Sequence, residues 1–284
     1  MGIYRLYVFV TSREIPQRPP VLSPLSVLSD LRPVVVTMTT PAFTKVRETV
    51  TMDAIRADHR LWRQMHFADW DAVPQPVRDS GLRAMVRAYA HVFKGPALWR
   101  TMTAADWDEI PQPVRAMAYL RMIWYWALAE DVGAEFGLEP SGLAQTIGAI
   151  VMAESWFEHR AVNEKAWGNR DLGLAQCSDH CRETIDAMAV EGAIGFAPSD
   201  ADYFEPWIAA RVATVWFERE LHRAGGDVDL AIRAYHRGIT VAADETDEKG
   251  TTYHARVIRL RERYIRTQQA SESWRFLTRA IASL

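Results

Sequence analysis

Helical periodicity runs through nearly the whole chain from residue 52 onward, and it is the feature that most restricts the fold. Apolar residues recur three or four positions apart, and no convincing run alternates apolar with polar residues as a half-buried strand does. The clearest example is an apolar stripe at steps of 4, 3 and 1 residues, formed by Leu143, Ile147, Ile150 and Val151. The sequence therefore predicts an all-α, mainly helical fold.

Glu154 continues this stripe three residues after Val151, which places a carboxyl group on the helix face that should be buried. Burial disfavours the charged form and raises the pKa, so such a group is either paired or held for chemistry. A polar segment, residues 163–171, and a glycine turn, residues 173–176, follow it. This layout is typical of saccharide-cleaving sites. The alternative is a core glutamate neutralised by a neighbouring arginine.

Composition and charge narrow the class of protein. The chain has 284 residues, 49% hydrophobic and 24% charged, which suffices for one large domain or two small ones. A formal net charge of −3 gives no indication of a nucleic acid partner. No stretch reaches the ~20 apolar residues of a membrane span. The apolar run at residues 6–10 lacks a clean cleavage site and makes a poor signal peptide, so the export route stays open.

The region before residue 139 divides into two parts. Residues 1–50 are rich in proline, and we expect them to be disordered or to precede the true translation start. Residues 51–138 are expected to be helical and contain an internal duplication, in which 68–78 recurs 37 residues later as 105–115. Trp70 and Trp107 hold matching places in the two copies. They are interpreted as packing anchors at two helix starts, with paired sugar platforms as the alternative.

The chain has two cysteines, Cys177 and Cys181, with His180 between them. A local disulfide in an oxidising compartment is one interpretation. A metal site is another, although it would need more ligands at set spacings. Two unconnected thiols are the default expectation, and no metal or cofactor is predicted.

Three ordered groups of residues carry a family resemblance. The first is Glu154-Ser155-x-Phe157 with Ala161, Asn163, Gly173-Leu174 and Gln176. The second, within residues 216–238, holds Gly225-Gly226-Asp227 and Ala234-Tyr235-His236-Arg237-Gly238, and the third is Tyr253 with Val257. Together they resemble the soluble lytic transglycosylase catalytic domain of glycoside hydrolase family 23, over about residues 139–266. The resemblance implies a lysozyme-like catalytic domain, residues 139–284, after the helical N-terminal region.

The resemblance also implies a reaction. Such domains cleave the β-1,4 bond between N-acetylmuramic acid and N-acetylglucosamine in peptidoglycan without water and form 1,6-anhydromuramic acid. Glu154 would be the single acid and base. Substrate-binding roles would fall to Asn163, Gln176, Tyr235, Ser155 and Tyr253, although Ser155 is interpreted first as a hydrogen-bonding residue at the helix end. The chain departs from the family pattern at Ala175, where Met is usual, and at His236 and Arg237, where Asn and Ala are usual.

Asp171 opens an alternative reaction. It follows Glu154 by 17 residues and supplies a second catalytic carboxylate, as in a muramidase of the lysozyme type. It is otherwise a loop residue that caps a turn. A third possibility is a non-catalytic peptidoglycan-binding or structural component of a phage or secretion machine, with the N-terminal helices docking a partner. In each case the expected partner is the peptidoglycan glycan strand, in the periplasm or cell envelope.

Overall fold

The computed structural model describes residues 75–165, 168–244 and 246–266 of the 284-residue chain. The chain falls into two compact units, Met1–Tyr89 with Ile110–Val114, and Ala90–Glu109 with Arg115–Leu284. In the first unit the main described helix is α6 (Gln75–Ala88). The prediction for residues 1–50 and the first copy's Trp70 lie outside the described residues, and the domain boundaries at residues 50 and 138 stay predictions.

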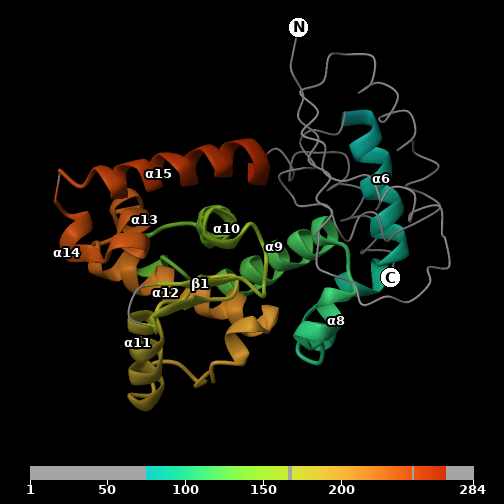
Figure 1. Ribbon diagram of the computed structural model, residues 1–284. Helices are drawn as coiled ribbons and strands as arrows, with labels where there is room; N and C mark the ends of the chain where they lie inside the picture. The colour runs from blue at the N-terminus through green and yellow to red at the C-terminus, as the bar shows by residue number, and fades with distance from the viewer. Residues whose placement is uncertain (1–74, 166–167, 245, 267–284) are drawn as a thin grey trace, which may run out of the picture. The chain divides into compact units, whose positions relative to one another are not determined.

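The described residues of the second unit form helices and one short antiparallel ribbon, as Figure 1 shows. Its helices are α7 (Pro96–Trp99), α8 (Ala104–Asp108), α9 (Gln112–Ala129, whose residues up to Val114 belong to the first unit), α10 (Pro140–Ser155), α11 (Asp179–Val190), α12 (Pro206–Arg223), α13 (Val228–Arg237), α14 (Ile239–Ala242) and α15 (Glu248–Leu260). Single-turn segments are η1 (Ala90–Phe93), η2 (Ala134–Phe136), η4 (Asp202–Phe204) and η5 (Arg261–Arg266). The predicted all-α fold is confirmed.

The ribbon pairs β1 (Val162–Glu164) with β2 (Arg170–Leu172). Its register places Asn163 opposite Asp171, so two of the predicted site residues become neighbours. No strand was expected from the sequence. Three-residue strands are too short to produce a recognisable alternation of apolar and polar residues, so the sequence pattern did not predict the ribbon.

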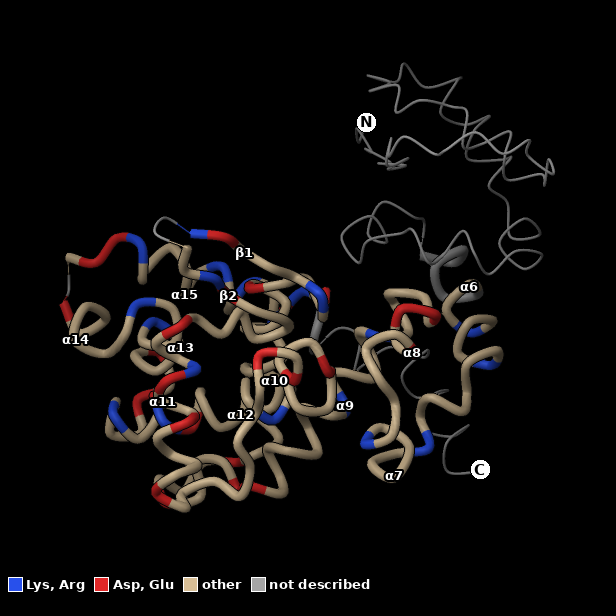
Figure 2. The backbone as a smooth tube through the Cα atoms, turned by 60° about the horizontal axis from the view of Figure 1, so that its bottom comes forward, with Lys and Arg blue, Asp and Glu red and all other residues tan. Residues whose placement is uncertain are grey.

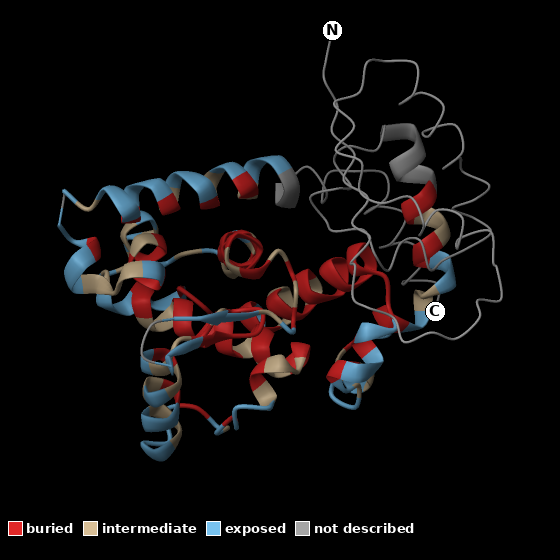
Figure 3. Ribbon diagram, in the orientation of Figure 1, coloured by how far each residue is buried: buried red, intermediate tan, exposed pale blue. Residues whose placement is uncertain are grey.

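Helix α10 is the core helix of the second unit. The stripe predicted from the sequence, Leu143, Ile147, Ile150 and Val151, is buried, with each side chain at most 5% exposed. Burial extends around the helix to Met152 on the opposite face, as expected for a helix enclosed on several sides. Helix α15 and helix α12 both pack against it, and Figure 3 shows α10 as a buried element between them.

Helix α15 covers α10 with one face only. Its buried residues Tyr253, Val257 and Leu260 recur at steps of 4 and 3, while most residues between them are exposed. Each fully buried aliphatic side chain of this kind contributes about 1.5–3 kcal/mol to folding. The periodic face therefore fixes the rotation of α15 and directs Tyr253 toward α10.

Charged residues of both signs are interspersed over the second unit. Helices α11 and α13 and the β1–β2 ribbon each carry acidic and basic residues, as Figure 2 shows. Within the part of the chain that the structure describes, no helix combines the length and apolar character needed to cross a membrane.

Candidate active site

Glu154 lies in the last turn of α10, with its side chain 15% exposed. The hydroxyl of Tyr253 in α15 donates a hydrogen bond to Glu154 Oε1 at 2.6 Å. Burial raises the pKa of Glu154 to about 7, and the nearby charge of Asp171 also raises it. The hydrogen bond from Tyr253 opposes this rise, because it stabilises the carboxylate. The carboxyl group can therefore both donate and accept a proton near neutral pH.

The chain turns sharply directly after Glu154. Trp156 and Phe157 have positive φ angles of 53° and 60°, a left-handed conformation that costs a non-glycine residue about 1–3 kcal/mol. Phe157 is completely buried, and its packing holds the chain in place where it leaves α10. The Ser155 hydroxyl lies 3.1 Å from the Val151 carbonyl oxygen and 3.0 Å from that of Leu174. Ser155 thus connects the end of α10 to the glycine turn, as its interpretation as a hydrogen-bonding residue anticipated.

A buried histidine network supports the segment after this turn. His159 is completely buried, and its Nε2 lies 3.2 Å from the Ala104 carbonyl oxygen and 3.1 Å from Asp108 Oδ1. Burial, followed by the charge of Arg115, lowers the pKa of His159 to about 4, so the ring is neutral at pH 7. The two acceptors assign the hydrogen to Nε2, which leaves Nδ1 to accept from the Tyr119 hydroxyl at 3.2 Å.

The second copy of the duplicated motif supplies this network. Trp107 is completely buried and packs edge-on against Tyr119, with ring centroids 5.2 Å apart. Arg115 lies 3.3 Å from Glu158, and Asp108 accepts a hydrogen bond from Arg160 at 2.6 Å. The interpretation of Trp107 as a packing anchor is confirmed, because a buried indole cannot serve as a sugar platform.

Asp171 makes one ion pair and one hydrogen bond. Lys165 Nζ lies 2.7 Å from its Oδ1, and Asn163 Nδ2 donates to its Oδ2 at 3.1 Å. Lys165 was not among the predicted site residues. Lys165 directly follows β1, two residues after Asn163, so recognition of the ribbon in the sequence would have placed the two side chains on the same face.

The glycine turn packs tightly against the rest of the unit. Gly173 has a φ of +67°, and a β-carbon there would overlap the carbonyl oxygen of Tyr203, so only glycine fits. Gln176 Nε2 donates to the Gly173 and Ala161 carbonyl oxygens at 3.0 and 3.3 Å. The Tyr235 hydroxyl donates to the Ala175 carbonyl oxygen at 3.1 Å. Gln176 and Tyr235 therefore support the turn, and their contact with substrate stays a prediction.

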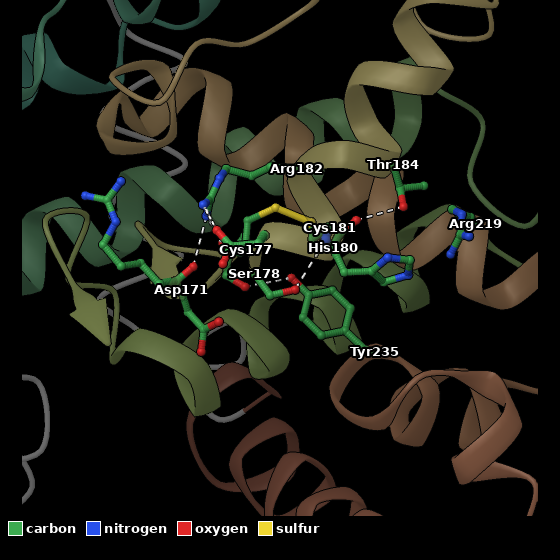
Figure 4. The surroundings of a disulfide bond; sticks show 12 residues. Asp171, Cys177, Ser178, His180, Cys181, Arg182, Thr184, Arg219 and Tyr235 are labelled. Atoms are coloured by element: carbon green, nitrogen blue, oxygen red, sulfur yellow. Dashed lines mark hydrogen bonds and ion pairs between the residues drawn. A yellow bond between two sulfur atoms is a disulfide. The ribbon is translucent and has the colours of Figure 1, made fainter. Parts of the chain in front are cut away.

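A disulfide joins the two cysteines, with Cα atoms 5.4 Å apart, so neither unconnected thiols nor a metal site is formed. Two backbone hydrogen bonds of 3.0 and 3.1 Å pair Cys177 with Leu172, the residue after Asp171. Cys181 lies in the first turn of α11. Figure 4 shows the disulfide between the turn and α11, with Asp171 and Tyr235 nearby. The bond thus fastens the turn beside the candidate acid to a neighbouring helix.

Two residues at departures from the family pattern lie at the end of α13. The ring of His236 stacks on that of Tyr253, with centroids 4.4 Å and planes 7° apart. Its Nδ1 lies 3.9 Å from Glu154 Oε1. Arg237 Nε lies 3.4 Å from Asp247 Oδ1, just before α15. The position of His236 directly after Tyr235 pointed toward the cleft, but the sequence did not reveal the stacking, because it joins two separate helices.

Comparison with protein families gives a match over much of this unit. Residues 135–256 match the family model described as the transglycosylase SLT domain. A search of curated proteins found no match. The matched segment holds every site residue predicted from the sequence, from Glu154 to Tyr253. With its all-α, lysozyme-like architecture, this part of the chain is a transglycosylase SLT domain, of the type that acts on peptidoglycan.

Proposed function

We propose that the chain is a lytic transglycosylase that cleaves the β-1,4 bond between N-acetylmuramic acid and N-acetylglucosamine, with Glu154 as the single acid and base. The observation that carries the proposal is the carboxyl group of Glu154, part-exposed at the end of α10 with a pKa of about 7. A group that titrates near the working pH serves both roles. The SLT match supports the reaction class.

The reaction has two proton transfers on one residue. Glu154 first gives its proton to the O4 oxygen of N-acetylglucosamine as the bond from this oxygen to C1 of N-acetylmuramic acid breaks. The Glu154 carboxylate then takes the proton of the C6 hydroxyl, whose oxygen attacks C1. The new bond closes the 1,6-anhydro ring, and Glu154 regains its proton without consuming water. The hydrogen bond from Tyr253 stabilises the carboxylate between the two steps.

The surroundings of Asp171 favour this reaction over hydrolysis. A retaining hydrolase of the lysozyme type uses a second carboxylate as nucleophile. Here Lys165 holds one carboxylate oxygen of Asp171 and Asn163 holds the other. The ion pair and the hydrogen bond hold the carboxylate in place, and the positive charge of Lys165 stabilises its negative charge, which weakens it as a nucleophile. We assign Asp171 an electrostatic role, since its charge opposes loss of the proton from Glu154.

The proposed place of action is the cell envelope, where peptidoglycan lies. The disulfide between Cys177 and Cys181 supports an oxidising compartment such as the periplasm. The glycan strand is the proposed partner. Docking to an envelope or phage assembly through the N-terminal helices stays a prediction, since much of that region lies outside the described residues.

The proposal is tested by the release of soluble fragments from purified peptidoglycan. Glu154→Gln keeps the shape of the side chain but cannot exchange the proton, so release should fall by about 10²–10⁴-fold. Asp171→Asn should reduce release by less than about tenfold, the factor that corresponds to one pKa unit on Glu154. Glu183→Gln removes an exposed carboxyl group on α11 and serves as the matched control.

Two outcomes would contradict the proposal. Equal loss in Glu154→Gln and Asp171→Asn, with fragments that end in reducing sugars, would identify a muramidase with two catalytic carboxylates. Tight binding of the native chain to insoluble peptidoglycan, with no release at any pH, would identify a binding protein.

A further inference from the structure

His236 and Arg237 stand at the two positions after Tyr235 where this chain departs from the family pattern. Both make defined contacts close to the proposed acid. His236 contacts the ring of Tyr253, and Arg237 contacts Asp247 ahead of α15. Both residues that depart from the family pattern therefore contact α15 or the residue before it, and α15 carries the Tyr253 that donates to Glu154.

We infer that His236 is a positioning residue, whose ring holds the Tyr253 hydroxyl against Glu154 and keeps water from that side of the carboxyl group. The inference rests on the proposed function of Glu154 and deepens it. It concerns a residue type that the family pattern does not supply at this place.

The stacked geometry supports a positioning role. The two rings are parallel within 7°, and their centroids lie 4.4 Å apart. A phenol ring aims its hydroxyl through only two side-chain torsions, so a flat neighbour pressed on its face restricts where the hydroxyl points. The Tyr253 residue is 7% exposed, whereas the His236 side chain is 42% exposed. His236 therefore forms the solvent side of the pair.

The distance to the acid indicates that His236 acts through Tyr253. Its Nδ1 lies 3.9 Å from Glu154 Oε1, beyond the length of a hydrogen bond. Burial, followed by the charge of Arg237, lowers the pKa of His236 below its ordinary value. At neutral pH the ring is therefore uncharged and places no cation beside the acid.

Several charged or titratable groups surround the neutral ring of His236. These groups are Glu154 of α10, Lys165 and Asp171 at the ribbon, Arg237 of α13, Asp247 before α15, and Tyr253 and Arg256 of α15. Lys165 and Arg237 favour the neutral form of His236, while Asp171 and Asp247 oppose it. The pKa of His236 is lowered overall, so the ring is uncharged and positions Tyr253 through packing and not through a charge.

A second contact fixes the frame in which the rings stack. The Asp247 carboxylate is 6% exposed and lies 3.4 Å from Arg237 Nε. Asp247 is also the residue before the first turn of α15. A β-carbon at Gly250 would overlap the Asp247 carboxylate, so the two groups fit closely. The end of α13 is thereby joined to the start of α15, with His236 and Tyr253 between them.

The experiment is a ¹³C NMR titration of the glutamate side-chain carboxyl groups in the full chain. The Glu154 signal is identified by its absence from the Glu154→Gln spectrum. In the native chain it should titrate at about 7. His236→Ala and His236→Asn both remove the stacked ring, so water reaches the carboxyl group. Burial is the largest cause of the raised Glu154 pKa, so its loss should outweigh the opposite effect of a weakened Tyr253 hydrogen bond, and the titration should fall below about 6.

His236→Phe tests whether the ring is what matters. It keeps a flat ring but has no nitrogen, and its Glu154 signal should titrate as in the native chain. His254→Ala is the matched control, because His254 follows Tyr253 on α15 but bonds to Asp229. In peptidoglycan cleavage, kcat of His236→Ala should fall about tenfold below that of His236→Phe with little change in KM, as one pKa unit implies.

The titration needs no turnover, so it separates this inference from the proposed function. An unchanged Glu154 titration in folded His236→Ala and His236→Asn would overturn the inference even if the chain cleaves peptidoglycan. A His236→Phe variant that titrates like His236→Ala would overturn it too, since a nitrogen rather than the ring would then be required. A lowered titration restored by Phe would support it even in a chain that releases no fragments.

Discussion

The Tyr253 hydroxyl donates a 2.6 Å hydrogen bond to Glu154 Oε1, across 99 residues of sequence. Glu154 ends α10, and Tyr253 lies on the buried face of α15 together with Val257 and Leu260. The packing of α15 against α10 therefore determines how strongly the carboxylate is stabilised. The packing of Tyr253 in the core and the pKa of Glu154 are therefore coupled.

Tyr253→Phe should move the pH dependence of cleavage. The first step requires protonated Glu154, so the rate should fall as the pH rises through about 7. Loss of the hydrogen bond removes a contact that favours the carboxylate and raises the pKa further. The fall should therefore begin at a higher pH, measured as kcat/KM between about pH 5 and 9. Tyr235→Phe is the control, because the Tyr235 hydroxyl donates to the Ala175 carbonyl oxygen and not to Glu154. A fall at the native pH or lower in Tyr253→Phe would contradict the role.

Glu154→Gln should make the protein more stable at alkaline pH. The pKa of Glu154 rises from 4.5 to about 7 on folding, so between these values the folded chain holds a proton that the unfolded chain loses. Stability therefore falls as the pH rises through this window, and the full cost remains above it. At pH 8 the variant should gain roughly 3 kcal/mol, and near pH 4 almost nothing. Urea unfolding at both pH values checks this. An equal change in the free energy of unfolding at pH 4 and pH 8 would exclude the proposed link between the Glu154 pKa and stability.

Gly173→Ala should destabilise the chain strongly. The β-carbon would overlap the Tyr203 carbonyl oxygen, and φ is +67°. Gly137 has a φ of +68° but nothing within 4 Å of an added β-carbon, so it is the matched control. We expect a loss of about 1 kcal/mol for Gly137→Ala and more than about 3 kcal/mol for Gly173→Ala, measured by denaturant unfolding. Similar losses would show that the turn yields to the added carbon.

Removal of the disulfide should lower stability moderately. A bond that closes a loop of about five residues contributes roughly 2 kcal/mol in the chain-entropy description. The double variant Cys177→Ser with Cys181→Ser and the chemically reduced native chain should therefore share one lowered unfolding midpoint. Thermal unfolding with and without reductant measures it. A midpoint that reductant leaves unchanged would argue against the bond in solution.

The central helix and the acid could be predicted from the sequence. The stripe from Leu143 to Val151 has helical spacing, and Glu154 continues it, so burial and a raised pKa follow from periodicity alone. The family motifs then indicated the SLT domain that residues 135–256 match. These features are local in the sequence, which is why they were accessible.

The contacts around the acid could not be predicted, because they join distant segments. Lys165 faces Asp171 only through the pairing of two very short strands. His236 meets Tyr253 only when α13 packs beside α15. A sequence separation of four residues leaves the distance between the β-carbons of Cys177 and Cys181 undetermined, so the disulfide stayed one of three alternatives.

The most direct test of the proposed mechanism is digestion of purified peptidoglycan in ¹⁸O-labelled water, followed by mass spectrometry of the fragments. If Glu154 alone directs attack by the C6 hydroxyl, the fragments end in 1,6-anhydromuramic acid and carry no ¹⁸O. If water attacks instead, each cleavage places one ¹⁸O atom at a reducing end. That result would contradict the single-residue mechanism and show that the chain is a hydrolase.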